Sequence, residues 1–136
     1  MRREFQLPGE DVRFLDSLGL PWEAIIQGSD RWVLIHEHPL PGGYNHQRVT
    51  VAVLISGGYP ESPLDMFFLH PAVARADGVT IPASEVRQAL DGKTFQRWSR
   101  HRPGDEPWRP GVDNLETHLV LIRDAFADEF TKRPRR

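Results

Sequence analysis

Apolar residues recur at helical spacing in two stretches of the chain, which predicts a helix near each end. The first stretch runs from Gly9 to Gly19, and Gly19 is a signal for the end of a helix. The second begins at Pro110, a residue favoured in the first turn of a helix, and runs to about Phe130. The apolar positions that share one face are Val12, Leu15 and Leu18 in the first helix, and Leu115, Leu119, Ile122 and Phe126 in the second.

Between the two helices the pattern changes to the period of two that is typical of strands. Strands are expected over residues 32–35, 48–55 and 66–69. In the middle strand the alternation partners Thr50, Ala52 and Leu54 are mostly apolar as well. Both faces of this strand should therefore be covered, one by a helix and the other by a loop or a partner protein. Turn residues separate the three strands at hairpin spacing, which predicts an antiparallel meander.

A long segment, residues 70–93, carries no sustained pattern beyond one helical turn from Ser84 to Leu90. Loops of this length are commonly functional. The order helix, three strands, loop, helix predicts an α+β domain with the helices on one face of the sheet. We expect a single domain over 8–130, followed by a basic flexible tail over 131–136.

Composition narrows the class of protein. A length of 136 residues suits one domain, and 39% hydrophobic residues with a formal charge of −2 are typical of a soluble globular protein. This charge argues against a nucleic-acid partner. The N-terminal residues are followed by no apolar core of a signal peptide, and no apolar run is long enough to span a bilayer. We therefore expect a cytoplasmic protein without a membrane partner.

The chain contains no cysteine. A disulfide framework, a thiolate zinc site and thiol catalysis are therefore excluded together. Any covalent chemistry must use a hydroxyl or another side chain as its nucleophile.

Three motifs occur in the order found in ubiquitin-carrier (E2) enzymes: Pro41-Gly42-Gly43-Tyr44, Tyr59-Pro60-Glu61-Ser62-Pro63, and Trp108-Arg109-Pro110. The set resembles prokaryotic E2 family E, bacterial E2-like proteins found alongside multi-ubiquitin proteins, E1-like adenylating enzymes and JAB-type peptidases. The resemblance implies a UBC-like fold with a long active-site loop. It also implies a ubiquitin-like protein and an E1-like enzyme as partners, and a JAB-type peptidase in the same pathway. We expect no cofactor and no metal.

The resemblance also implies a position for the nucleophile. Ser99 lies nine residues before Trp108, close to the spacing at which an E2 enzyme carries its cysteine. A serine hydroxyl needs a base and donors for the oxyanion. In an extended chain His101 points to the same side as Ser99, and Arg97 and Arg100 add positive charge. The carboxylates that could orient His101 are left open: Asp91, Asp105, Glu106 and Asp113.

One departure from the E2 pattern leaves two functions open. The His-Pro-Asn element that stabilises the oxyanion in E2 enzymes is matched only by His70-Pro71-Ala72, which lacks the amide donor. The first hypothesis is a transferase that holds a ubiquitin-like protein on Ser99 as an oxyester and passes it to a target. The second is a catalytically inactive E2-variant module that binds a ubiquitin-like protein.

Other residues are alternative candidates. Thr80 and Ser84 are rival hydroxyl nucleophiles, although they lie far from Trp108 in sequence. The three histidines of a conceivable metal site are His36, His38 and His46. We expect His118 to pack against the sheet, and Trp22, Trp32, Trp98 and Trp108 to be core or loop anchors. The first helix, with Arg13 exposed, is expected to face the E1-like enzyme.

Overall fold

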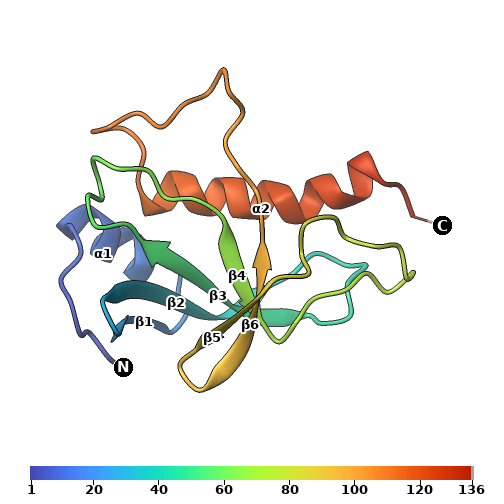
Figure 1. The fold of residues 1–136 in the computed structure, drawn as a ribbon, viewed down its shortest axis with the longest axis horizontal. Helices are drawn as coiled ribbons and strands as arrows, with labels where there is room; N and C mark the ends of the chain where they lie inside the picture. Colours follow the sequence, from blue (N-terminus) through green and yellow to red (C-terminus); the bar gives the residue numbers. More distant parts are fainter. Residues whose placement is uncertain (136) are drawn as a thin grey trace.

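The computed structural model describes residues 1–135, which form one antiparallel sheet and two helices (Figure 1). The sheet has six strands in the order β1-β2-β3-β4-β6-β5, so the α+β class is confirmed. No described helix is both long and apolar enough to cross a membrane. The elements are α1 (Gly9–Ser17), β1 (Trp22–Gln27), β2 (Asp30–Pro39), β3 (Arg48–Ile55), β4 (Phe67–His70), β5 (Arg87–Leu90), β6 (Lys93–Trp98) and α2 (Leu115–Lys132).

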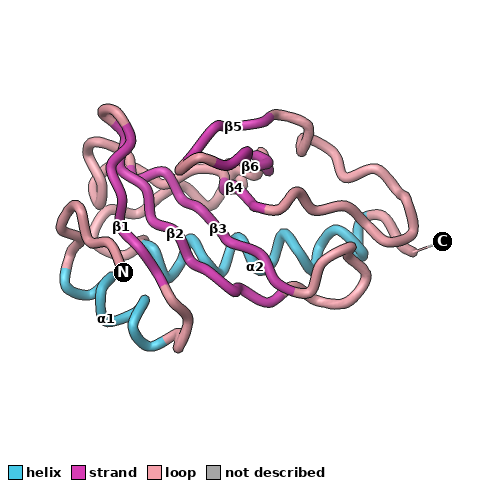
Figure 2. The backbone as a smooth tube through the Cα atoms, turned by 90° about the horizontal axis from the view of Figure 1, so that it is seen from below, coloured by secondary structure: helices cyan, strands magenta, loops and turns pink. Residues whose placement is uncertain are grey.

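Helix α2 lies across one face of the sheet (Figure 2). Its expected apolar face is confirmed, because Leu119, Ile122 and Phe126 are buried in the larger of two core clusters. Phe126 meets Phe67 and Trp98 there, with ring centroids 5.6 and 5.5 Å away. The strands that flank the candidate site are therefore held against α2 by aromatic packing.

The predicted start of this helix at Pro110 is wrong. Residues 110–113 form turns, and α2 begins at Leu115 behind the N-cap Asn114. The Asn114 side chain accepts a hydrogen bond from the Thr117 amide, and the Thr117 hydroxyl accepts one from the Asn114 amide. This reciprocal cap satisfies the backbone amides of Asn114 and Thr117 at the start of α2, so it decides where the helix begins. At its other end α2 extends to Lys132, into the expected tail.

A second core cluster lies on the opposite face of the sheet. It joins Trp32 and Ala52 of the central strands to Leu90 and Phe95 of the β5–β6 hairpin. Both faces of β3 are therefore covered, as expected, and the second cover is this hairpin. The curl of the sheet brings β5 towards β1, where the Gln27 side chain donates to the Ala89 carbonyl (3.0 Å) and accepts from the Asp91 amide (2.9 Å).

The helical turn predicted from Ser84 to Leu90 is wrong, because residues 87–90 form strand β5. The two residues after it, Asp91 and Gly92, both have positive φ values, 53° and 74°. Asp-Gly in this conformation makes the tight turn of a hairpin, and Leu90 and Phe95 beside it are buried. The sequence pattern also did not predict strands β1 and β6. Because β5 and β6 occupy the end of the long segment, its irregular part is residues 71–86.

The first prediction concerns the packing of α2 on the sheet. Leu119 is 2% exposed, so Leu119→Ala should leave a cavity and lower the free energy of unfolding by about 2–5 kcal/mol. Val120, the next residue on the helix, is 54% exposed and provides the control, since Val120→Ala should change stability by less than about 0.5 kcal/mol. Urea denaturation measures both. Equal effects of the two substitutions would contradict this packing.

Candidate active site around Ser99

Ser99 is the first residue after β6, and its position is fixed from both sides. The preceding residue, Trp98, is completely buried between Phe67 and Phe126. The Ser99 amide donates a hydrogen bond to the Ala83 carbonyl (3.0 Å) in the segment before β5. The chain therefore leaves the sheet at a defined point and rises as the segment 99–113 before it returns to α2 (Figure 1).

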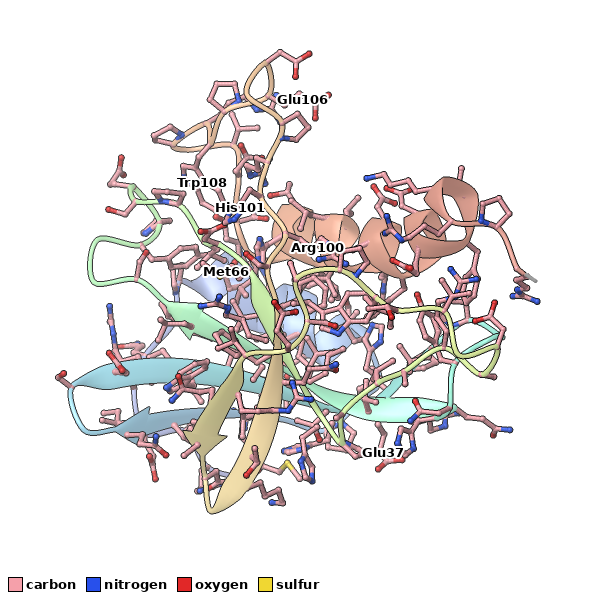
Figure 3. The ribbon with its side chains drawn as sticks, turned by 45° about the vertical axis from the view of Figure 1, so that its right-hand side comes forward. Glu37, Met66, Arg100, His101, Glu106 and Trp108 are labelled. Carbon is pink, nitrogen blue, oxygen red and sulfur yellow. The ribbon has the colours of Figure 1, made fainter. Side chains whose placement is uncertain are left out.

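The Ser99 hydroxyl lies beside an imidazole that a carboxylate orients. His101 Nε2 is 3.2 Å from Ser99 Oγ, and His101 Nδ1 is 2.8 Å from Asp65 Oδ1. If Nδ1 carries the proton and donates it to Asp65, Nε2 has a free lone pair that accepts the Ser99 hydroxyl. The order hydroxyl, imidazole, carboxylate is that of a serine hydrolase triad. Figure 3 shows His101 beside Met66 and Trp108 at the base of the 99–113 segment.

Asp65 is the carboxylate that the sequence did not identify. Strands β4 and β6 are antiparallel, and Phe67 pairs with Trp98, so the residues just before β4 lie next to those just after β6. Met66 has a φ of 56°, and its amide donates to Asp65 Oδ1 (3.1 Å), which fixes the carboxylate. The pairing of these two strands is the signal that could have found Asp65.

Among the described residues, none of the four carboxylates considered from the sequence forms a hydrogen bond or an ion pair with His101. Asp91 pairs with Arg2 at the β5–β6 hairpin (2.7 Å). Asp113 is buried and accepts a hydrogen bond from the Arg109 amide (2.7 Å). Asp105 and Glu106 are exposed, with Glu106 at the tip of the 99–113 segment (Figure 3). None of these four residues orients the imidazole in this structure.

Arg97 and Arg100, which flank Ser99 in the sequence, lie in different environments. The Arg100 guanidinium donates to the carbonyls of Pro82 (3.1 Å) and Ser99 (3.0 Å) and lies over the Trp98 ring. These contacts hold the backbone that carries Ser99. Arg97 is in β6, opposite Phe68, and its Nε atom is buried without a hydrogen-bond partner among the described residues.

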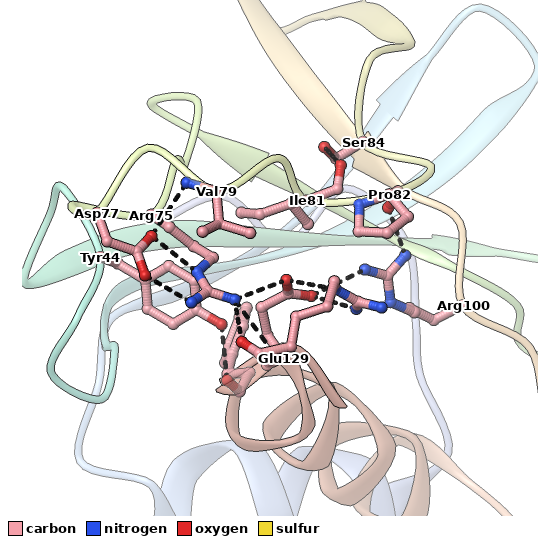
Figure 4. A network of polar contacts seen from close by, with 11 residues as sticks. Tyr44, Arg75, Asp77, Val79, Ile81, Pro82, Ser84, Arg100 and Glu129 are labelled. Atoms are coloured by element: carbon pink, nitrogen blue, oxygen red, sulfur yellow. Dashed lines mark hydrogen bonds and ion pairs between the residues drawn. The ribbon is translucent and has the colours of Figure 1, made fainter. Parts of the chain in front are cut away.

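A buried ion-pair network connects this site to α2 (Figure 4). Its centre is Glu129, which is 1% exposed and pairs with Arg133 (2.6 Å) and Arg75 (3.4 Å). The Arg100 guanidinium lies 4.0 Å from the same carboxylate. Burial alone would raise the pKa of Glu129, but the Arg133 and Arg75 guanidinium groups hold it below its usual value. The network thus joins the loop 71–86, the end of α2 and the backbone next to Ser99.

The Tyr59-Pro60 motif before β4 and the Trp108 motif of the 99–113 segment contact one another. Trp108 Nε1 donates to the Pro60 carbonyl (3.0 Å). The Tyr59 hydroxyl donates to Asp11 Oδ2 in α1 (2.7 Å) and accepts from the amide of Leu115, the first residue of α2 (2.9 Å). Tyr59 and Trp108 therefore tie the junction before β4, the 99–113 segment and both helices together.

The rival nucleophiles lie elsewhere. Ser84 is buried, and its hydroxyl donates to the Ile81 carbonyl (2.7 Å). Thr80 is exposed in the loop 71–86. In the described part of the chain neither hydroxyl has a histidine partner. His70 is also turned away from Ser99, because its Nδ1 is 3.1 Å from the Thr94 carbonyl and its ring packs near Phe95.

The three-histidine metal site does not form, and no cluster of potential metal ligands occurs among residues 1–135. A bulge at Glu37, with a φ of 58°, shifts the register of β2 between Ile35 and His38. His36 therefore contacts Glu23 and Thr50, whereas His38 contacts α2. Burial, together with the Arg123 guanidinium, lowers the pKa of His38 to about 4, so this imidazole is neutral at neutral pH.

His118 is buried, as expected, with its Nε2 atom 2.8 Å from the Met66 carbonyl. Its ring thus supports the turn that carries Asp65. The expected anchoring role of the tryptophans is also confirmed. Trp22, Trp32 and Trp98 are buried, and Trp108 is hydrogen-bonded to the Pro60 carbonyl.

A groove of about 410 Å³ opens beside His101, between the 99–113 segment and α2. His101 and Arg102 line one wall. The α2 side presents Val120 and Leu121, with charged groups of both signs around them.

The chain matches the family model of prokaryotic E2 family E over residues 7–129, and it belongs to this family. Comparisons with curated proteins and with solved structures give no match. Family membership indicates an E2-like role in prokaryotic ubiquitin-like conjugation, with a ubiquitin-like protein and an E1-like enzyme as the general partners of that role.

The second prediction concerns the Glu129 network. Among residues 1–135, Glu129→Gln leaves Arg75, whose side chain is 0% exposed, with Asp77 as its one remaining counter-charge. Breaking a buried ion pair from one side typically costs about 3–5 kcal/mol, and we expect about 2–4 kcal/mol because Asp77 remains. Asp128→Asn, at an exposed neighbouring position, is the control and should change stability by less than about 0.5 kcal/mol.

The same pair of variants has a defined pH dependence. The pKa of Glu129 is lower in the folded protein than in the unfolded chain, where it is near 4.5, so its stabilisation is fully present above pH 4.5. It is lost as the pH falls through the folded-state pKa. Denaturation midpoints between pH 7 and pH 3 should therefore fall less for Glu129→Gln than for the wild type. Parallel curves for the two proteins would contradict the network.

Proposed function

We propose that this protein is an E2-like carrier that accepts a ubiquitin-like protein from an E1-like adenylating enzyme and holds it on Ser99 as an oxyester. The observation that carries the proposal is the 3.2 Å contact between Ser99 Oγ and His101 Nε2. Ser99 also lies nine residues before Trp108, a spacing that resembles the one between cysteine and tryptophan in E2 enzymes. A serine hydroxyl is a weak nucleophile unless a base removes its proton. His101 is placed to do so.

The loading step follows from this geometry. Ser99 Oγ attacks the activated carbonyl carbon of the modifier, and its proton moves to His101 Nε2. The carboxylate of Asp65 stabilises the resulting imidazolium through Nδ1. The tetrahedral intermediate then expels the leaving group of the E1-bound donor, which takes the proton from His101. Ser99 is left as an oxyester of the modifier.

The transfer step repeats the same proton movements. An amine or hydroxyl of the target attacks the oxyester carbonyl, its proton moves through His101 Nε2 to Ser99 Oγ, and the serine is released. Arg97 and Arg100 flank Ser99 in the sequence, and we expect their charge to favour the anionic intermediates. This contribution matters because Ala72 stands where E2 enzymes carry the asparagine amide.

The alternative function is an E2-variant module that binds a ubiquitin-like protein without bonding to it. The missing amide donor at Ala72 favours it. Both functions use a ubiquitin-like protein as a partner, and the carrier function also uses an E1-like enzyme. A JAB-type peptidase in the pathway and a cytoplasmic location are further expectations of either function.

The third prediction separates the two functions. With the E1-like enzyme, ATP and the ubiquitin-like protein, the wild type should form an adduct that hydroxylamine and base cleave. Ser99→Ala should abolish the adduct, and Ser99→Cys should restore it as a thioester that a reducing agent cleaves. His101→Ala should slow its formation by about 10²–10⁴-fold while modifier binding stays nearly intact.

The control for this experiment is Ser29→Ala, in the exposed turn between β1 and β2, which should load like the wild type. If the wild type forms no adduct with full E1 and ATP supply, the binding module is the function. An adduct that persists in Ser99→Ala places the nucleophile elsewhere, with Thr80 and Ser84 as the next residues to test.

The fourth prediction concerns the E1-like partner. In α1, Asp11 and Leu15 are buried, whereas Arg13 is exposed. The Arg13 side chain therefore has no role in the core. Arg13→Glu should therefore weaken binding to the E1-like enzyme and leave stability unchanged. Arg48→Glu, an exposed arginine at the start of β3, is the control. Unchanged affinity of Arg13→Glu in a titration would remove α1 as the docking surface.

A further inference from the structure

We propose that the Ser99–His101–Asp65 triad also makes this protein an esterase that hydrolyses activated esters of neutral aliphatic acids, without an E1 enzyme or a modifier. This inference rests on the same nucleophile as the proposed function but needs none of its partners. A thiol carrier works without a base that is held by a carboxylate. Here the hydroxyl, the imidazole and the carboxylate are connected through contacts of 3.2 and 2.8 Å.

The reaction has two balanced steps. In the first, Ser99 Oγ bonds to the acyl carbon, His101 Nε2 takes the hydroxyl proton, and the alcohol or phenol leaves with that proton. In the second, water attacks the acyl-serine, and His101 takes one water proton and returns it to Ser99 Oγ as the carboxylic acid departs. Nothing is oxidised or reduced, and the solvent is the only co-reactant.

Access of water to this triad supports the second step. The side chains of His101 and Asp65 are 59% and 49% exposed. The triad lies where the 99–113 segment leaves the sheet. An acyl group on Ser99 is therefore open to attack by water that the same imidazole can activate. Loss of the acyl group to water is a consequence of using a hydroxyl at an exposed site.

The groove beside His101 indicates the acyl group. Its α2 wall carries Val120, Leu121 and Ala125, and Val120 is 54% exposed although it is a large apolar residue. Charged groups of opposite sign flank this strip, for example Arg102 and Asp124, so the groove has no strong preference for a charged acyl group. A short aliphatic chain would cover Val120 and remove apolar surface from water.

The probes are p-nitrophenyl acetate and p-nitrophenyl butyrate, whose hydrolysis releases a coloured phenolate. With the purified wild type we expect a burst of phenolate followed by a slower steady rate, because the activated ester acylates Ser99 faster than water deacylates it. Added hydroxylamine should raise the steady rate. The butyrate should have a higher kcat/KM than the acetate by about threefold to tenfold, since two further methylene groups reach the groove.

Variants assign the activity to the triad. Ser99→Ala should reduce the rate to the uncatalysed background, whereas Ser29→Ala should leave it unchanged. Asp65→Asn should lower kcat by about tenfold or more with little change in KM, because Asp65 acts by positioning His101. The matched control is Asp105→Asn, an exposed aspartate of the 99–113 segment that should retain full activity.

A further pair of variants tests the groove. Val120→Asp should remove the preference for butyrate over acetate. Val112→Asp changes a valine of the same 54% exposure outside the groove and should retain it.

The outcomes separate this inference from the proposed function. Two results would overturn the esterase activity. One is a wild type that releases no phenolate above background, and the other is a Ser99→Ala variant that releases phenolate as fast as the wild type. If E1-dependent loading of Ser99 still occurs in that case, the carrier function stands alone. Ser99-dependent release without any E1-dependent adduct supports the esterase and contradicts the carrier. Equal rates for both esters in the wild type would overturn the acyl groove.

Discussion

The buried carboxylate of Glu129 is the constraint around which the site is built. A carboxylate that is 1% exposed is stable in its charged form only if cations surround it, and Arg75, Arg100 and Arg133 do so from three segments of the chain. Those segments are the loop 71–86, the residues after β6 and the end of α2. Because Arg100 also donates a hydrogen bond to the Ser99 carbonyl, the requirement to neutralise Glu129 fixes the backbone that carries Ser99.

In the carrier function that we propose, the absence of cysteine accounts for the form of the site. A thiol needs little assistance because part of it is ionised near neutral pH, whereas a serine hydroxyl needs a base. The base must in turn be held in the correct tautomer, which is the role that Asp65 takes for His101. An oxyester is also less activated than a thioester, so the same imidazole must assist its transfer. Both needs converge on three residues from two adjacent strand ends.

The sequence predicted those features that depend on local pattern. The apolar face of α2 and strand β3 follow from the spacing of apolar residues. The pair Ser99–His101 was predicted from the resemblance to E2 enzymes together with the two-residue spacing of the pair, and the two side chains are in contact. The features that it did not predict depend on contacts between distant segments. Asp65 reaches His101 only because β4 pairs with β6, and β5 is a strand only because an Asp91-Gly92 turn returns it along β6. The bulge at Glu37, which separates His36 from His38, leaves no periodic signal either.

The central claim is that Ser99 is an activated nucleophile, and its reaction with a fluorophosphonate probe tests this most directly. The probe bonds to serines that a neighbouring base activates and needs no E1 enzyme, modifier or ester substrate. After incubation of the wild type and peptide mapping by mass spectrometry, we expect one labelled residue, Ser99, and slower labelling in His101→Ala. An unlabelled Ser99, or labelling at an equal rate in the two proteins, would contradict the account.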